Sequence, residues 1–260
     1  LAASGIGKIH LVDFDTVDVT NLHRQVFYSL EDTGKLKTET LAKFIQKRAP
    51  FTVVTVDNVP VTKQNVFNMI SRADVVVDAT DSLPTKYVLN DACVLKHKTL
   101  VYGSLYKFDG YVASFNVKQD DGSYSANLRD AFPEMTADIP NCEEAGTLNT
   151  IVSFIAAQQV NEVLKLLVGI GEPLTNQLLV YNALRNSQLK MRLTSLDVSE
   201  SERQQRISVI FGNETYFDAS CELQNADWLI SSSALKSELG RTNLEIISVI
   251  ENLKAPFKLD

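Results

Sequence analysis

The chain has 260 residues, of which 45% are hydrophobic and 22% charged, and its formal net charge at pH 7 is −7. This composition is typical of a globular protein with one or two domains, and it excludes a wholly disordered, collagen-like or coiled-coil protein. The negative net charge provides no overall attraction for nucleic acid, and the uninterrupted apolar runs are far shorter than the roughly 20 residues that cross a bilayer.

Short apolar runs alternate with segments of helical periodicity along most of the chain. Strands are predicted at residues 8–14, 51–59, 74–79, 99–102, 111–116, 177–181 and 189–193. Helices are predicted at residues 38–48, 65–72, 86–96 and 150–167, with Gly169 ending the last of them, and Gly110 is expected at a turn between two strands. Alternating strands and helices indicate an α/β fold with a parallel sheet, and continuous apolar strands indicate a sheet covered on both faces.

Two polar stretches interrupt this pattern. Residues 117–150 contain two prolines and no convincing periodic segment, which is typical of a functional or mobile connection. Residues 197–205 are charged and polar and are the best linker candidate, after which a helix at 232–239 and a strand at 244–249 are predicted. We therefore expect a first domain at residues 1–195, a linker at 196–230 and the beginning of a small α/β domain at 231–260.

Acidic residues follow two of the predicted strands. Asp13 and Asp15 come after the first strand, and Asp78 and Asp81 surround the end of DVVVDATDS. Ligands of open parallel sheets bind at the carboxyl ends of the strands, where a carboxylate can accept hydrogen bonds from a ribose or hold Mg²⁺ that bridges to phosphates. Aspartates that cap turns or helices are the common alternative.

The segment DFDTVDVTNLHRQ adds polar and cationic groups next to the first strand end. Arg24 can bind phosphate oxygens with two parallel hydrogen bonds, Asn21 can donate from its amide, and Lys37 at the next helix offers a point charge. Together these side chains are typical of a triphosphate site, although either cation alone would more often be a solvated surface charge. The sequence GIGK at residues 5–8 is no phosphate loop, because a Walker motif has four residues between its glycines.

Four motifs in order, DFDTVDVTNLHRQ, GKLK, DATDS and CEEAG, resemble those of the MoeB and ThiF adenylyltransferases, relatives of the ubiquitin-activating enzymes. The resemblance covers residues 1–195. It implies a Rossmann-like sheet in which parallel strands are followed by antiparallel strands. It also implies an enzyme that uses ATP and Mg²⁺ to adenylylate the C-terminal Gly-Gly carboxylate of a ubiquitin-like sulfur-carrier protein, with pyrophosphate leaving, and that forms a homodimer.

The resemblance also implies roles for individual residues. Asp13 would bind the ATP ribose, supported by Asp15, and Asp81 would hold Mg²⁺. The triphosphate side of the site would be formed by four residues with cationic or amide side chains, Asn21, Arg24, Gln25 and Lys37. In nucleotidyl transfer most of the catalysis is positioning and charge stabilisation, which requires cations and a metal rather than an acid/base pair.

Three cysteines, Cys93, Cys142 and Cys221, are too widely spaced and odd in number to form a disulfide framework or a four-cysteine zinc site. In relatives a cysteine at the position of Cys142 can form a covalent link with the carrier, and a thiolate there could attack the acyl-adenylate. A spectator role is equally consistent, since Glu143 and Glu144 would raise the thiol pKa. Few, widely spaced cysteines suit a reducing compartment, so we expect a cytoplasmic protein. We expect no nucleic-acid or membrane partner.

The sequence departs from the family pattern at three places. The chain begins at LAASGIG, which resembles the helix after the family's first strand and glycine-rich ATP loop, so we expect a longer parent chain. The first cysteine pair of the zinc site in relatives aligns with Asn127 and Asp130, so we expect no zinc. The tail from residue 206 resembles the linker and first αβ unit of a rhodanese-like domain.

Two other functions are compatible with parts of the sequence. A non-catalytic scaffold could bind a ubiquitin-like partner without activating it. A nicotinamide-dependent oxidoreductase could use Asp13 for a ribose, but it would not explain why Asn21, Arg24 and Lys37 gather on the triphosphate side. Adenylylation accounts for more of these residues than either alternative.

Overall fold

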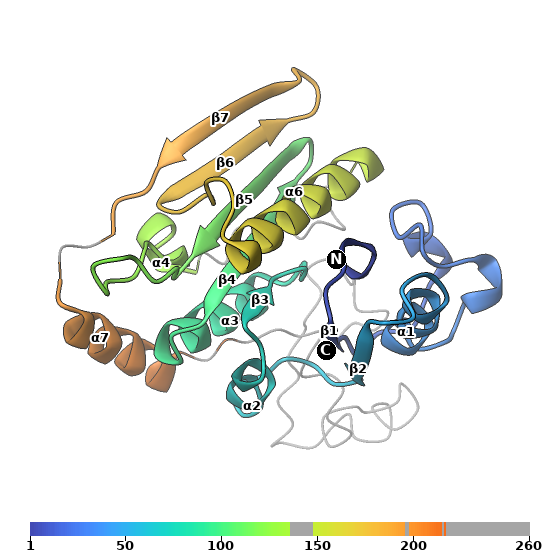
Figure 1. Cartoon of the computed structure of the whole chain (residues 1–260), viewed down its shortest axis with the longest axis horizontal. Coiled ribbons are helices and arrows are strands. Elements are labelled where there is room, and N and C mark those ends of the chain that lie inside the picture. Colours follow the sequence, from blue (N-terminus) through green and yellow to red (C-terminus); the bar gives the residue numbers. More distant parts are fainter. Residues whose placement is uncertain (136–147, 196–197, 215, 217–260) are drawn as a thin grey trace, which may run out of the picture. The chain divides into compact units, whose positions relative to one another are not determined.

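The computed structural model describes residues 1–135, 148–195, 198–214 and 216, and their β-strands form a sheet in two pieces with helices packed beside them (Figure 1). The smaller piece is the parallel pair β1 (Lys8–Val12) and β2 (Val53–Asp57). The larger piece has the order β3-β4-β5-β6-β7, in which β3 and β4 are parallel and the later neighbours antiparallel. Its members are β3 (Val75–Val77), β4 (Thr99–Tyr106), β5 (Asp109–Phe115), β6 (Gln177–Asn182) and β7 (Ser187–Arg192).

The helices follow the predicted alternation. Short 3-10 turns are η1 (Ala2–Ser4), η2 (Val19–Asn21) and η3 (Leu30–Asp32). The α-helices of the described residues are α1 (Lys37–Arg48), α2 (Val66–Ser71), α3 (Leu83–Leu95), α4 (Leu128–Ala131), α6 (Asn149–Val168) and α7 (Glu200–Asn213). The predicted α/β class, with parallel strands before antiparallel ones, is confirmed.

Within the described part of the chain, no strand pairs with both pieces of the sheet. β1 pairs there only with β2, and β3 only with β4 among the strands. An unpaired strand edge leaves a row of backbone groups without strand partners, and the apolar residues of β3 are half-buried instead of fully buried. The predicted burial of β3 is therefore only partial.

Helix α6 covers one face of the antiparallel strands. Its Ile151 and Ile155 pack with Val112 of β5 and Leu179 of β6. Gly110 lies inside β5 under this helix, where a Cβ atom would come within 2.4 Å of the side chain of Ile155. The predicted turn at Gly110 is thus wrong, because the reversal occurs at Lys107, which adopts φ 54°.

By length and composition α6 is also a helix that could cross a membrane. It packs instead on β3, β4 and β5, and two polar side chains on its inner face bond to the sheet region. Gln159 donates to the carbonyl of Asp78, and Glu162 accepts from Ser114. These contacts are those of a helix that packs against a sheet.

The opposite face is covered by α3, with α2 and α7 beside it. Cys93 of α3 is fully buried in this core, as predicted, and burial raises the pKa of its thiol. The helix begins at Leu83, three residues before the predicted start, because the Ser82 hydroxyl accepts from the Thr85 amide and Pro84 occupies the first turn.

Helix α7 lies within the expected linker at 196–230. Ser199 and Glu202 form a capping box at its start, and Arg203, Ile207 and Phe211 are buried along its inner side. Residues 200–213 of the expected linker thus form a packed helix, and their polar side chains belong to its outer side. The predicted domain at 231–260, with its rhodanese-like helix and strand, lies outside the described residues.

Candidate functional site

The carboxyl end of β1 carries the first pair of candidate residues. Asp13 follows the strand directly, and its backbone N–H donates to the carbonyl of Asp57 at 3.2 Å, so the ladder with β2 continues one residue further. The Asp13 carboxylate accepts from the Asp15 N–H at 2.9 Å, which turns the chain immediately afterwards. Burial raises the pKa of Asp13 above its ordinary value, and the nearby carboxylates of Asp15 and Asp81 add to the rise.

Lys37 brings a buried cation to this strand end. It is the first residue of α1 and only 8% exposed. Its Nζ donates to Asp15 Oδ2 at 2.7 Å and its backbone N–H donates to the Asp15 carbonyl at 3.0 Å. Tyr28 donates to the Lys37 carbonyl at 3.2 Å, and burial raises the pKa of that phenol to about 12. Lys37 is thereby directed at the carboxylates that leave β1.

The segment between β1 and α1 places the amide and guanidinium groups. Asn21 is buried at the end of η2, where its side-chain oxygen accepts from the Asp18 N–H at 3.4 Å. The Arg24 guanidinium contacts the Thr20 carbonyl at 3.2 Å and the His23 ring at 3.0 Å. The buried Oε1 of Gln25 has no hydrogen-bond partner among the described residues, which leaves an acceptor for a bound group.

Helix α6 reaches both strand ends. Its first residue, Asn149, donates to the His23 carbonyl at 3.2 Å, and Gln159 donates to the Asp78 carbonyl at 2.7 Å. Ten residues of α-helix separate these contacts by about 15 Å along the helix axis. One rigid element therefore spans the region between the segment after β1 and the end of β3.

Two aspartates that follow β3 and lie close together in the sequence have different environments. Asp78 is fully buried, pairs with Lys86 at 3.0 Å and accepts from Thr80. Asp81 is exposed and lies near enough to Asp13 to raise the pKa of that carboxyl. Asp81 is thus available to a ligand, whereas Asp78 is committed to the protein interior.

The predicted site residues fall into three groups. Asp15 is in direct contact with both Asp13 and Lys37, and Asp81, which follows β3, acts electrostatically on Asp13. Asn21, Arg24 and Gln25 lie together on the segment after β1. Cys142 falls within residues 136–147, which the structure does not describe.

Two contributors to the site were not predicted. Lys86 and Gln159 hold the end of β3 from different helices. The only sequence signal for these two residues is a polar side chain on the inner face of an otherwise apolar helix. Their shared partner, Asp78, lies 8 residues from Lys86 and 81 from Gln159, so no local pattern indicates the contact.

Asn127 and Asp130 stand where the sequence aligns with a cysteine pair of a zinc site, and here they form hydrogen bonds with the backbone. Asn127 accepts from the Arg129 N–H at 2.9 Å, and Asp130 accepts from the Asn127 N–H at 2.9 Å, which is a capping box at the start of α4. In the described ranges no group of three or more histidine, cysteine, aspartate or glutamate side chains could hold a metal ion.

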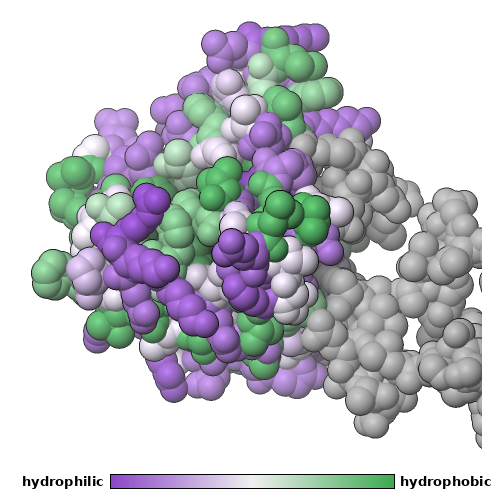
Figure 2. Space-filling model, turned by 90° about the vertical axis from the view of Figure 1, so that its right-hand side faces the viewer, coloured by the Kyte–Doolittle hydropathy of each residue, from purple (hydrophilic) through white to green (hydrophobic). Residues whose placement is uncertain are grey.

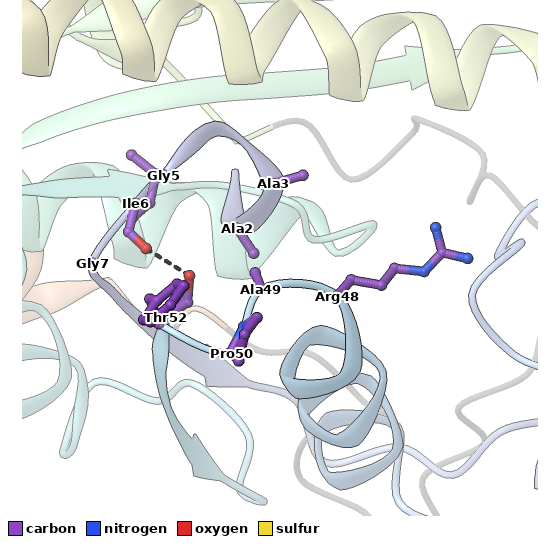
Figure 3. A pocket seen from close by; sticks show the side chains of 10 residues that line it. Ala2, Ala3, Gly5, Ile6, Gly7, Arg48, Ala49, Pro50 and Thr52 are labelled. Atoms are coloured by element: carbon purple, nitrogen blue, oxygen red, sulfur yellow. Dashed lines mark hydrogen bonds between the residues drawn. The ribbon is translucent and has the colours of Figure 1, made fainter.

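A small pocket lies at the opposite end of the strands. Its volume is about 270 Å³, and η1 and the connection from α1 to β2 form its walls (Figure 3). Thr52 donates across it to the Ile6 carbonyl at 2.9 Å. Because it adjoins the amino ends of β1 and β2, it is separate from the aspartates at their carboxyl ends.

Comparison with known proteins gives the family. A model of the ThiF family matches residues 1–205. A sulfur carrier protein adenylyltransferase of Thermus thermophilus is 39% identical over 193 residues, which cover 74% of this chain and 71% of that protein. The SAMP-activating enzyme E1 of Haloferax volcanii is 37% identical over 186 residues, 71% of this chain and 67% of that protein. The probable adenylyltransferase/sulfurtransferase MoeZ of Mycobacterium tuberculosis is 38% identical over 189 residues, and the chain spans 48% of its length.

Solved structures share the fold. E. coli MccB, crystallised with ATP, superposes with a TM-score of 0.66 at 21% identity, covering 76% of this chain and 59% of MccB. At that identity the likeness concerns the fold alone. The family match over most of the sequence and relatives at 37–39% identity show that this chain belongs to the ThiF family and is an enzyme of the adenylyltransferase class.

Proposed function

We propose that the protein uses ATP and Mg²⁺ to adenylylate the C-terminal Gly-Gly carboxylate of a ubiquitin-like sulfur-carrier protein. The observation that carries the proposal is the buried Lys37, held at 2.7 Å from Asp15 beside Asp13 and Asp81, which follow β1 and β3, each a strand of a parallel pair. A cation and several carboxylates at this place suit a nucleotide triphosphate and its metal. The relative from Thermus thermophilus that is named a sulfur carrier protein adenylyltransferase supports the substrate class.

The donor set fits ATP and Mg²⁺. Asp81 is an exposed carboxylate, a hard oxygen ligand of the kind that Mg²⁺ prefers beside substrate phosphates. Asp13 would accept hydrogen bonds from the ribose, with Asp15 holding Lys37 in place. The unpartnered Oε1 of Gln25 would find a donor in the bound nucleotide or its water. ATP supplies the adenylyl group when it is bound.

The chemistry assigned to the protein's own residues is charge stabilisation. Lys37 and Arg24 would neutralise the negative charge that grows on the phosphate oxygens as the carboxylate attacks, and Asn21 would donate from its amide. Among the described residues, Arg24 contacts only its neighbours Thr20 and His23 through the hydrogen bonds of its guanidinium, and phosphate oxygens would replace these partners. A role of Cys142 in a covalent link with the carrier stays a prediction.

The surface next to these residues suits a protein partner. The segment between β1 and α1 exposes four large apolar side chains, Val19, Val26, Phe27 and Leu30. The face of the molecule on this side mixes apolar patches with polar residues (Figure 2). Exposed apolar patches with polar surroundings are typical of protein interaction sites. They support the proposed carrier and also the homodimer that the resemblance implies.

The test is ATP–pyrophosphate exchange with Mg²⁺ and a panel of carrier proteins that end in Gly-Gly. We expect exchange that depends on a carrier and is lost in Arg24→Ala and Asp81→Ala. The matched controls are Arg72→Ala, an exposed arginine after α2, and Asp121→Ala, an exposed aspartate in a surface turn, and both should retain exchange. A folded protein that binds ATP but exchanges with no carrier would favour the scaffold function.

A further inference from the structure

The carboxyl end of β3 is held from two helices at once. Lys86 of α3 donates to Asp78 Oδ2 at 3.0 Å and to the Gly103 carbonyl at 2.7 Å. Both side chains of this ion pair are buried, at 5% and 0% exposure. The Lys86 ammonium also lies 5.2 Å from the centre of the Tyr102 ring. Lys86 thus ties α3, β3 and β4 together at one point.

Gln159 of α6 completes the arrangement. Its Nε2 donates to the Asp78 carbonyl at 2.7 Å and to the Val101 carbonyl at 3.3 Å. The chain makes room for it at Gly103, where a Cβ atom would lie 2.4 Å from the Gln159 side chain. We call Asp78, Lys86 and Gln159 the Asp78 clamp. The clamp fixes both the side chain and the backbone of the residue that ends the strand.

Stability alone is a weak explanation for the clamp. A buried ion pair is often no more stabilising than apolar side chains of similar volume, because both charges lose their hydration. The pair instead fixes the direction of the Asp78 side chain. Asp78 Oδ1 accepts from the Thr80 N–H at 3.0 Å and from its hydroxyl at 2.8 Å, so the side chain held by Lys86 also sets the path of the next residues.

The residue that this path presents is Asp81. It lies between two fixed points, the clamp at Asp78 and the Ser82 cap of α3, and its carboxylate acts on Asp13 across the site. We propose that Lys86 and Gln159 are positioning residues that hold the Asp78 turn so that Asp81 faces the end of β1 and can bind a divalent cation with ATP. This inference deepens the proposed function and rests on its assignment of Asp81.

Binding of Mn²⁺ tests the proposal without any carrier or turnover. The full protein is titrated with Mn²⁺ in the presence of ATP, and bound Mn²⁺ is measured by electron paramagnetic resonance. Partners that orient a metal ligand typically change metal affinity about 10–100-fold when they are removed. We expect a loss of that size in Lys86→Met and in Gln159→Met, and retention within a few-fold in Lys86→Arg, which keeps the charge.

Lys98→Met is the matched control. Lys98 donates to the Ala73 carbonyl at 2.7 Å, so it makes the same kind of bond at the amino end of the same strand, away from Asp81. The single variant Lys86→Met leaves the buried charge of Asp78 without its partner, which could prevent folding. The double variant Asp78→Asn with Lys86→Met removes this charge and is used if the single variant does not fold. It should bind Mn²⁺ as weakly as Lys86→Met, because the direction of the turn is lost in both.

Three results would overturn the proposal: wild-type Mn²⁺ affinity in folded Lys86→Met and Gln159→Met, an equal loss in Lys98→Met, or Mn²⁺ binding that is unaffected by Asp81→Asn. Amide exchange of residues 78–83 gives a second readout in the absence of nucleotide. It should be faster in the two clamp variants than in Lys98→Met, and equal rates would refute the clamp. Wild-type protein that binds Mn²⁺ through Asp81 but shows no carrier-dependent exchange would contradict the proposed function and leave the clamp intact.

Discussion

Lys37→Met should separate activity from stability. Lys37 is 8% exposed, and methionine preserves most of the buried aliphatic stem. The lost ion pair is with Asp15, whose side chain is 48% exposed, so solvent screening limits its contribution to about 0–1 kcal/mol. Removal of a positive charge from the first position of α1 offsets part of this loss, since the helix dipole disfavours a cation there by about 0.3–1 kcal/mol.

The effect on the reaction should be much larger. Loss of one group that stabilises developing charge lowers the rate about 10²–10³-fold, or about 3–4 kcal/mol in the activation free energy. We therefore expect Lys37→Met to unfold in urea near the wild-type midpoint while ATP–pyrophosphate exchange falls by that factor. The control is Lys35→Met, two residues earlier, whose side chain is 56% exposed and pairs with Asp32. Equal exchange in the two variants, or a large loss of stability in Lys37→Met alone, would refute this reasoning.

Three further predictions concern the fold and the strand end. Gly110→Ala should lower the free energy of unfolding by about 1–3 kcal/mol, because the added Cβ would overlap Ile155, and denaturant unfolding measures it. Phe211→Ala in α7 should lower it by about 3–5 kcal/mol, because the ring is buried in the core against α3. Asp13→Asn should stabilise the protein at pH 7 while weakening ATP binding. Burial raises the pKa of Asp13 in the folded state, so the protonated carboxyl favours folding at pH values below the unfolded pKa near 3.8. This contribution to stability is lost as the pH rises through the folded pKa, and asparagine, which carries no charge, does not lose it.

Each of these predictions has a control. Gly7→Ala should be tolerated, since no atom lies within 4 Å of the added Cβ, and a loss equal to that of Gly110→Ala would contradict the packing argument. Val209→Ala on the outer side of α7 is 57% exposed in the wild type and should change stability little. For Asp13→Asn, the stability difference from wild type should shrink as the pH is lowered toward 4, and a difference that grows instead would contradict the sign of the pKa shift.

Sequence reasoning located the elements whose signal is local. The strand at residues 53–57 and the helix at 37–48 have apolar residues at the spacing of their own period, so their predicted places agree with the structure. Helix α7 has only a few apolar residues among charged ones, and its burial comes from contact with α3. Gly110 was misplaced because a glycine between two strands is typical of a turn, whereas here α6 requires it.

The site was predictable where strand ends supply it. Asp13 and Asp15 follow a strand, and Lys37 opens the next helix, so their approach follows from the rule that ligands bind at the carboxyl ends of parallel strands. The choice of Asp81 over Asp78 came from resemblance, and the buried pair of Asp78 with Lys86 supplies the physical reason for it. That pair joins residues of different elements and leaves no local pattern in the sequence.

Transfer of the adenylyl group to a carrier tests the central proposal most directly. The protein is incubated with Mg²⁺, a carrier and ATP labelled at the α-phosphate, and label on the carrier is measured. The account predicts label on a carrier that ends in Gly-Gly and none on the same carrier without these two residues, with loss in Arg24→Ala. Label that does not require the Gly-Gly carboxylate, or its absence with every carrier while ATP is bound, would contradict the account.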